Sequence, residues 1–280
     1  MKDFTFIFTV GGDKHHYTNM FRCMRSFERL SFKPKCLVLE FGNQLKTCDD
    51  YEVISYPKLI DFNSGKKVGY IIWRHKYEGA LQVKTKYGAY IDTDTVIAQD
   101  NFKYLVSQLK GGIAVTKHFW VPSIGAYREK AVSGNNVMDF EHARDMLNLS
   151  YEDSFYAGGF FLFENNSNVR EIFKRTLFFN DSFYSGKDAY VKSITDELFF
   201  AAALKERKDL IREIGGGFNH CSMGDEHMPM MLYDSLLYGK NSYELFWTKV
   251  TVLHCDVERR DPSEKYEGCL KEEIKKAFYI

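Results

Sequence analysis

Short apolar runs alternate with longer amphipathic segments over the first hundred residues of the chain. The apolar runs predict buried strands, and the segments with helical periodicity predict helices. The predicted strands span 4–10, 36–41, 52–56 and 87–91, and the predicted helices span 18–30 and 73–86. Strands that alternate with helices favour a parallel sheet with crossover helices. We therefore predict an α/β fold with a Rossmann-like, open, mostly parallel twisted sheet, which would bind ligands along its carboxyl edge.

The alternation is less regular in the rest of the chain. The pattern predicts helices at 102–109, 169–179, 195–205 and 263–278, strands at 113–116, 155–164 and 250–255, and a loop at 118–137. The glycine pair Gly158-Gly159 lies inside a predicted strand, where glycine often marks the close approach of a ligand or another backbone. No repeat or linker divides the sequence, so we predict a single domain of 280 residues.

Two carboxylates, Asp92 and Asp94, directly follow the predicted strand 87–91. Side chains alternate along an extended chain, so residues i and i+2 point to the same side. Paired oxygen donors at a strand end suit Mg²⁺ or Mn²⁺, with a phosphorylated ligand completing the coordination shell. Acidic pairs also serve as turn residues or helix caps. The apolar residues on both sides of this pair favour the metal site.

A second group of candidate functional residues lies near the carboxyl terminus. His254 ends the predicted strand 250–255 and is either a packed histidine or a metal ligand. Arg259 and Arg260 follow it, and arginine suits bidentate binding of phosphate oxygens. A solvated charge run is the alternative interpretation of the two arginines.

Asp196 and Glu197 begin the predicted helix 195–205. Carboxylates in a first helical turn interact favourably with the helix dipole without any catalytic role. The functional alternative is a carboxylate that acts as a base, or as a nucleophile toward a sugar carbon. The sequence leaves both interpretations open.

Composition narrows the classes of function. Lys plus Arg equals Asp plus Glu at 38 each, which lacks the basic excess typical of nucleic-acid-binding proteins. The six cysteines form no CxxC pair, which argues against structural zinc and favours reduced thiols in a cytosolic compartment. The apolar stretch at the amino terminus is too short to span a membrane. We therefore expect a soluble, cytoplasmic protein without a signal peptide or transmembrane anchor.

Taken in order, these motifs resemble the GT-A class of nucleotide-sugar glycosyltransferases, most closely the family that includes the blood-group and α1,3-galactosyl enzymes. Asp92-Thr93-Asp94 is similar to the DxD motif of that family, and Asp196-Glu197 to its Asp-Glu pair. Three further segments carry the resemblance: Phe8-Thr9-Val10-Gly11, the aromatic-glycine strand Phe155 to Phe161, and Leu253-His254 through Arg259-Arg260-Asp261-Pro262.

The resemblance implies a glycosyltransferase that uses a UDP-sugar and Mn²⁺ or Mg²⁺, with a glycan or glycoprotein as acceptor. Residues 1–100 would form the nucleotide-binding half, and residues 101–280 the acceptor-binding half with a closing carboxyl-terminal segment. The implied metal ligands are Asp92 and Asp94, with His254 as a third ligand, as in the glycogenin-like GT-A family. Glu197 would lie nearest the reacting carbon, with Asp196 on the donor sugar. The implied donor-binding residues are Val10, Gly11, Trp73, Arg74, Thr93, Gly158, Gly159, Arg259 and Arg260.

The chain departs from the family at two points. Leu198, Phe199 and Phe200 stand where the family has polar acceptor-binding residues, so the acceptor does not follow from the resemblance. The membrane stem of the Golgi enzymes is missing, which favours a bacterial or viral relative, and the chain's size is similar to that of xylosyltransferases from large algal DNA viruses. The donor sugar (galactose, glucose or xylose type), and inversion versus retention, stay open.

Two other classes of function are compatible with the same residues. A non-catalytic carbohydrate-binding module or pseudoenzyme would stack sugars on Phe119, Trp120, Tyr156 and Trp247, without any need for the Asp92/Asp94 pair. A metal-dependent nucleotidyltransferase or phosphohydrolase would use two aspartates, although the sequence has no GxxxxGKS/T loop to support it.

Overall fold

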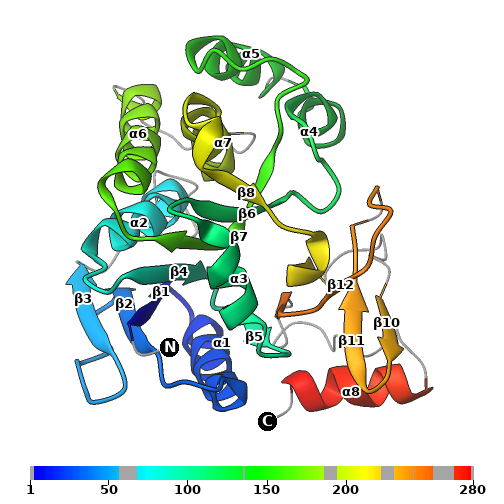
Figure 1. Ribbon diagram of the computed structural model, residues 1–280. Helices are drawn as coiled ribbons and strands as arrows, with labels where there is room; N and C mark the ends of the chain where they lie inside the picture. Colours follow the sequence, from blue (N-terminus) through cyan, green and yellow to red (C-terminus); the bar gives the residue numbers. More distant parts are fainter. Residues whose placement is uncertain are drawn as a thin grey trace.

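The computed structural model describes residues 3–56, 68–134, 136–185, 194–221, 230–241, 243–254 and 268–278, with only the backbone for 68–72 and 221. A seven-stranded sheet in the order β3-β2-β1-β4-β7-β6-β8 forms its centre (Figure 1). The strands are β1 (Phe4–Gly11), β2 (Lys35–Phe41), β3 (Glu52–Tyr56), β4 (Tyr87–Ile91), β6 (Ile113–Lys117), β7 (Tyr156–Glu164) and β8 (Ile211–Glu213).

One strand of this sheet runs against the others. The pairs β1–β2, β1–β4, β2–β3 and β6–β8 are parallel, whereas β7 is antiparallel to both of its neighbours, β4 and β6. The amino end of β7 therefore lies beside the carboxyl end of β4. The predicted fold class, an α/β protein with an open, mostly parallel sheet and helices, is confirmed.

Helices cover both faces of the sheet. On one face, α1 (Lys14–Arg25), the 3₁₀ turn Ser26–Arg29 and α3 (Phe102–Leu109) pack on the phenylalanines of β1. On the other face lie α2 (Val68–Gln82), α6 (Ser167–Tyr184) and α7 (Asp196–Glu206), with α4 (Ile124–Ala131) and α5 (Asn136–Met146) beyond them (Figure 1). Alternate residues of β1, such as Phe6 and Ile7, thus enter opposite cores.

Two small sheets extend the central one on its carboxyl side. One has the order β5-β13-β9, from Thr95–Ile97, Val252–His254 and Asn219–Cys221, and the other has the order β10-β11-β12, from Met230–Tyr233, Leu236–Gly239 and Thr248–Lys249. The last helix, α8 (Gly268–Phe278), packs on a third apolar cluster that includes Val96, Leu237 and Leu253. Short 3₁₀ turns lie at Lys208–Leu210 and Gly216–Phe218.

Several predicted boundaries and one predicted loop need correction. The first helix begins at Lys14 rather than 18, and α2 ends at Gln82 rather than 86. The segment 118–137, predicted as a loop, contains α4 and the start of α5. Ser123 caps α4 by accepting a hydrogen bond from the amide of Ala126 at 3.2 Å. Positions 255 and 263–267 of the last predicted strand and helix lie outside the described residues.

Two expectations from composition can be compared with the described part of the chain. The cysteines whose side chains are described, Cys23, Cys36, Cys48 and Cys269, are free thiols. Within the described ranges, no helix has both the length and the apolar character needed to cross a bilayer.

Candidate active site

Strand pairing brings three potential metal ligands together at the carboxyl edge of the sheet. Asp92 and Asp94 lie in the turn between β4 and β5, and His254 ends β13. Because β13 runs antiparallel to β5, with His254 opposite Thr95, the histidine reaches the aspartate turn from a position far away in the sequence. The hydroxyl of Thr95 donates to the carbonyl of Asp92 at 2.7 Å and fixes the turn.

These three side chains each offer one ligand atom, and all three atoms lie within 4.8 Å of one another. Nε2 of His254 is 2.8 Å from Oδ1 of Asp94 and 3.9 Å from Oδ2 of Asp92. The arrangement has the donor number and spacing of a metal site that leaves further coordination positions for a ligand.

The carboxylates set the protonation state of the histidine. Burial acts to lower the pKa of His254, but the adjacent Asp94 and Asp92 outweigh it and raise the pKa to about 9. Burial in turn acts to raise the pKa of Asp94, but His254 outweighs it, and the pKa is lowered. Without a cation, the pair is therefore an imidazolium beside a carboxylate at neutral pH.

The glycine pair of β7 forms the wall next to these ligands. The amide of Asp92 donates to the carbonyl of Gly159 at 2.9 Å. A Cβ atom on Gly159 would lie 2.8 Å from Oδ2 of Asp92 and 3.0 Å from Cε1 of His254. A Cβ on Gly158 would lie 3.0 Å from Cγ of Glu197. The close backbone approach predicted from the sequence is thus made by the candidate ligands and by Glu197.

A buried ammonium group connects the metal-ligand cluster to α7. Nζ of Lys76, on α2, is 3.3 Å from Oδ2 of Asp196 and 3.8 Å from Oδ1 of Asp92. Burial alone would lower the pKa of Lys76, but the carboxylates of Asp196 and Asp92 raise it well above its usual value. Lys76 is therefore a fixed positive charge between Asp92 of the metal-ligand cluster and Asp196 of α7.

Two buried tyrosines complete this polar network. The hydroxyl of Tyr77 donates to Oδ2 of Asp196 at 2.9 Å, and the hydroxyl of Tyr90 donates to Oδ1 of Asp92 at 2.6 Å. Tyr90 also contacts the hydroxyl of Thr9 on β1 at 3.0 Å. Each carboxylate is thus held by a tyrosine and by the lysine, which limits its freedom to reorient.

Glu197 lies one residue further along α7 and faces the glycine pair. Its Oε1 accepts a hydrogen bond from the amide of Gly158 at 2.8 Å. Burial and then the neighbouring Asp196 raise the pKa of Glu197 to about 7, against the opposing effects of Lys76 and the Gly158 amide. A carboxyl group with this pKa can exchange a proton near neutral pH, as acid–base catalysis requires.

The residues predicted to bind the donor, so far as the structure describes them, divide into two groups. Val10 and Gly11 are buried at the carboxyl end of β1, the strand beside β4, and Thr93 lies between the two aspartates. Arg74 instead forms ion pairs with Asp181 at 2.7 Å and Glu78 at 3.0 Å, on the part of α2 that faces α6. Trp73 precedes it and is partly buried. The two predicted arginines, Arg259 and Arg260, lie outside the described residues.

An aromatic group borders the metal-ligand cluster on the side of β6. The ring of Phe119 lies edge-on to the ring of His254, with centroids 6.4 Å apart, and His118 and Trp120 flank it. Burial lowers the pKa of His118 to about 4, so this imidazole is neutral. Among the described residues, neither Nδ1 of His118 nor Nε1 of Trp120 has a hydrogen-bond partner. Buried groups of this kind are satisfied by a ligand or by water.

Sequence reasoning missed Lys76, Tyr77, Tyr90 and His118. In a sequence pattern, a single lysine, tyrosine or histidine is ordinarily taken as an exposed or a packed residue. Only the tertiary structure places these four side chains at the site. One signal was available for Tyr90, which stands two positions before Asp92 at the end of an extended strand, where residues i and i+2 point to the same side.

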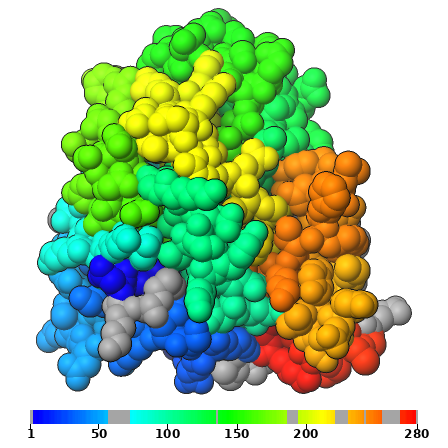
Figure 2. Space-filling view, viewed as in Figure 1, coloured from blue at the N-terminus to red at the C-terminus, as the bar shows by residue number. Residues whose placement is uncertain are grey.

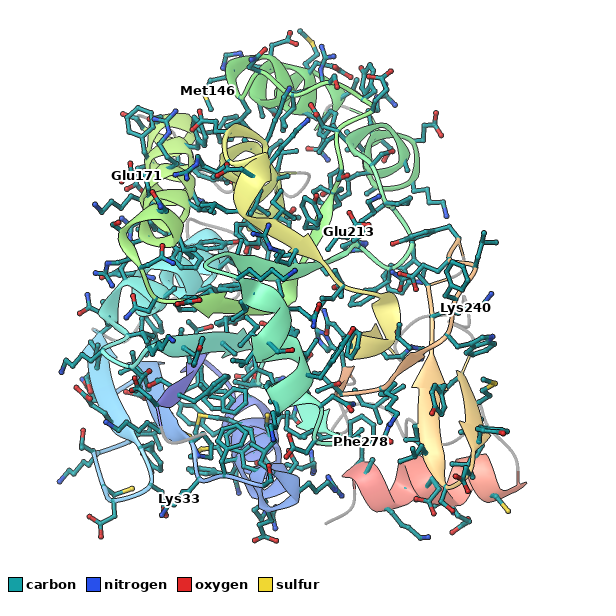
Figure 3. All side chains as sticks on the ribbon, viewed as in Figure 1. Lys33, Met146, Glu171, Glu213, Lys240 and Phe278 are labelled. Carbon is teal, nitrogen blue, oxygen red and sulfur yellow. The ribbon has the colours of Figure 1, made fainter. Side chains whose placement is uncertain are left out.

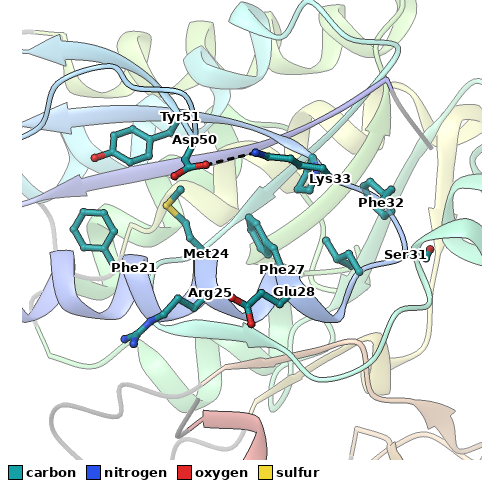
Figure 4. A pocket seen from close by; sticks show the side chains of 12 residues that line it. Phe21, Met24, Arg25, Phe27, Glu28, Ser31, Phe32, Lys33, Asp50 and Tyr51 are labelled. Carbon is teal, nitrogen blue, oxygen red and sulfur yellow. Dashed lines mark ion pairs between the residues drawn. The ribbon is translucent and has the colours of Figure 1, made fainter.

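A separate cavity of about 850 Å³ lies between α1, the following turn and residues 50–51 (Figure 4). Apolar side chains such as Phe21, Met24 and Phe27 line it, and Lys33 and Asp50 form an exposed ion pair there at 3.6 Å. None of the metal-ligand, glycine or α7 residues described above lines this cavity, so it is not part of the candidate active site.

The fold and the site define an α/β protein with a carboxylate–carboxylate–imidazole cluster at the carboxyl edge of its sheet. No protein-family model and no curated protein matches the chain. Its fold is similar to that of several solved structures over most of the chain.

The galactosyltransferase LgtC, solved in complex with donor and acceptor sugar analogs, is similar in structure, with 12% sequence identity and a TM-score of 0.56. The match covers 98% of this chain and 95% of the LgtC chain. An active-site mutant of LgtC matches 98% and 94%, with 13% identity and a TM-score of 0.58. Mouse xyloside xylosyltransferase 1 in its apo form matches 92% and 99%, with 10% identity and a TM-score of 0.53. The chain therefore shares its fold, over nearly its whole length, with glycosyltransferases.

Proposed function

We propose that the protein is a metal-dependent glycosyltransferase that moves a monosaccharide from a UDP-sugar, of the galactose, glucose or xylose type, to a hydroxyl group of a glycan or glycoprotein. The observation that carries the proposal is the cluster of Asp92, Asp94 and His254, with ligand atoms within 4.8 Å, beside Glu197 and the glycine pair. The glycosyltransferases among the structural neighbours support it at the level of the fold.

The residues present fit a divalent cation. Two carboxylates and one imidazole supply mixed oxygen and nitrogen donors, which suit Mn²⁺ better than Mg²⁺, since Mg²⁺ prefers oxygen ligands alone. Gly159 leaves the space that Asp92 and His254 occupy. The cation would be held by Asp92, Asp94 and His254, and when bound it supplies positive charge to the diphosphate of the departing UDP.

The chain's own residues supply the remaining functions in this proposal. Residues 1–100 bind the nucleotide, with uracil near Val10 and Gly11, and residues 101–280 bind the acceptor and close the site. Lys76 holds Asp92 and Asp196 in fixed positions, with Asp196 toward the donor sugar. The neutral imidazole of His118 and the indole of Trp120 offer hydrogen bonds and an aromatic surface to a sugar. Arg259 and Arg260 would bind the diphosphate, and Trp73 and Arg74 would lie near the uracil.

Glu197 is the proposed catalytic carboxylate. In its ionised form it acts either as the nucleophile or ion-pair stabiliser of a retaining reaction, or as the base that deprotonates the acceptor hydroxyl in an inverting reaction. The hydrogen bond from the amide of Gly158 fixes one carboxylate oxygen, Oε1, against the wall of the site. Its distance from the sugar carbon and the sugar face it meets decide between the two outcomes.

The test is the thermal stability of the protein with UDP, GDP or CMP, each in the presence of Mn²⁺, Mg²⁺ or EDTA. A ligand that binds only the native state adds about 2.7 kcal/mol to the free energy of unfolding at one hundred times its Kd. We expect an increase in the melting temperature with UDP plus Mn²⁺ and none with UDP plus EDTA. Asp94→Ala should abolish the increase, and Asp145→Ala, which changes an exposed carboxylate on α5, should retain it.

An absence of any shift with every nucleotide would refute the proposal. If the shift occurs, incubation with UDP-sugars and a glycan separates the transferase from the other metal-dependent class. Release of UDP supports glycosyl transfer, whereas release of pyrophosphate from a nucleoside triphosphate would identify a nucleotidyltransferase.

A further inference from the structure

Three consecutive large apolar side chains are exposed at the tip of the loop between β11 and β12. Leu245 is 85% exposed, Phe246 81% and Trp247 37%, and we call these three residues the apolar tip. Single exposed apolar residues are common on protein surfaces, but a contiguous group marks a binding surface. The loop belongs to the orange segment at the right of the molecule in Figure 2.

The apolar tip is held in place by the loop around it. Both carboxylate oxygens of Glu244 accept hydrogen bonds from the amide of Gly216, at 2.8 and 3.0 Å, and one of them also accepts from the amide of Asn241 at 2.8 Å. On the other side of the tip, the hydroxyl of Thr248 accepts from the amide of Gly217 at 2.9 Å. Hydrogen bonds of Glu244 and Thr248 therefore hold both ends of the apolar tip, while Leu245 and Phe246 remain exposed.

Two lysines, Lys240 and Lys249, flank the apolar tip in the sequence. Glu244 is the single acidic residue of segment 240–249, and its carboxylate is directed inward onto backbone amides. Lys249 is exposed, and Nζ of Lys240 lies 5.3 Å from the centre of the Trp247 ring. Lys240 is labelled at the right margin of the molecule in Figure 3. Apolar and aromatic residues flanked by lysines are typical of segments that lie in the interface of a lipid bilayer.

The loop is also attached to the border of the candidate active site. The hydroxyl of Tyr243 donates to the carbonyl of His118 at 3.1 Å, and Nδ2 of Asn241 donates to the carbonyl of Lys117 at 3.4 Å. His118 directly precedes Phe119, whose ring contacts that of His254. A surface bound by the apolar tip would therefore lie beside the aromatic border of the site.

We propose that the apolar tip inserts into the interface of an anionic lipid bilayer, with Lys240 and Lys249 near the lipid headgroups. Leu245 and Phe246 then leave water for the boundary of the acyl chains, and the lysines meet anionic headgroups of opposite charge. This inference does not require the transfer reaction. If the proposed function is also correct, docking would favour acceptors that are themselves anchored in the bilayer.

The test is sedimentation of the full chain with vesicles of phosphatidylcholine alone, or of phosphatidylcholine mixed with phosphatidylglycerol, without nucleotide or metal. We expect binding to the mixed vesicles, and a partition coefficient at least about tenfold lower for Leu245→Ser/Phe246→Ser. Lys249→Gln should lower binding to the mixed vesicles about fivefold. Tyr233→Ser and Met138→Ser, which remove side chains exposed by 68% and 82% at other places, should bind like wild type.

Three outcomes would overturn the inference. The first is that wild type fails to bind the mixed vesicles at low ionic strength, and the second is equal binding by the double variant. The third is a concentration-dependent dimer that the double variant loses, because the apolar tip would then be a contact between two copies of the chain. Both altered side chains are exposed, so the double variant should melt like wild type, and the separate nucleotide panel decides the proposed function.

Discussion

Replacing Lys76 with methionine removes the buried positive charge that lies between Asp92 and Asp196. The lysine side chain is only 8% exposed, and Oδ2 of Asp196 lies 3.3 Å from its ammonium group. Methionine fills a similar volume, so the substitution mainly removes charge. Asp196 is left as a buried carboxylate with one remaining hydrogen bond from this network, donated by Tyr77.

The expected loss of stability follows from this burial. Removing one partner of a buried ion pair costs about 3–5 kcal/mol, because the other charge stays buried without compensation. For a chain of this size, each kcal/mol lowers the melting temperature by about 2–4 °C, so Lys76→Met should melt about 10 °C below wild type. A matched substitution at an exposed ion pair, Lys84→Met opposite Glu52, should change the free energy of unfolding by less than about 1 kcal/mol.

The assay is thermal unfolding of wild type, Lys76→Met, Asp196→Asn and the double variant at neutral pH. Because the double variant leaves no lone charge at the pair, it should be more stable than the sum of the two single effects predicts, by about 2 kcal/mol or more. Additive effects would refute the reasoning, as would a Lys76→Met variant that melts within about 2 °C of wild type.

The pH dependence of the same variant supplies an independent check. The pKa of Glu197 in the folded protein is already raised to about 7, and Lys76 acts to lower it. Without the lysine, the folded state holds this proton to higher pH. A carboxyl group whose pKa is raised on folding contributes most stability below its unfolded pKa and loses that contribution as pH rises through the folded pKa. This effect should make the loss of stability in Lys76→Met smaller near pH 5 than near pH 8.

Three further outcomes concern Glu197, Gly159 and His254. Glu197→Gln, whose amide oxygen can still accept from Gly158, should lower turnover about 100-fold or more while UDP and Mn²⁺ still raise the melting temperature; turnover within a few fold of wild type would show that the carboxylate is not catalytic. Gly159→Ala places a methyl group 2.8 Å from Oδ2 of Asp92, so the Mn²⁺ affinity measured by calorimetry should fall about tenfold or more. Unchanged affinity would contradict the close packing of Gly159 against the metal ligands. Mn²⁺ must displace the proton of His254, whose pKa is about 9, so affinity should rise about tenfold per pH unit toward that value, and His254→Gln should reduce this slope.

The sequence predicted the half of the fold in which local pattern and tertiary environment agree. The strands 36–41, 52–56 and 87–91 and helix 102–109 match β2, β3, β4 and α3 to within one residue at each end. The central strands are continuous apolar runs between turn residues, so their pattern survives in any packing. The direction of β7 did not follow from its composition, because a buried apolar strand has the same sequence pattern whether its neighbours are parallel or antiparallel.

The segment 118–137 shows the opposite case. Its glycine, asparagine and aromatic residues favour a loop, yet Ile124 and Tyr127 are buried, and they hold α4 against the core. Tertiary packing thus overrides a weak local preference. The same reason explains why Lys76 was missed: α2 brings it under the glycine strand and against α7, and no local pattern distinguishes a buried lysine from an exposed one.

The candidate site is assembled almost entirely from the ends of elements. Asp92 follows β4, His254 ends β13, Asp196 begins α7, and the glycine pair lies near the start of β7. The reversed direction of β7 makes this possible, because it places the start of β7 beside the carboxyl end of β4. Lys76 is the exception, since it projects from within a helix. Because its ammonium group lies near both Asp92 and Asp196, we expect changes at Lys76 to affect metal and sugar binding together.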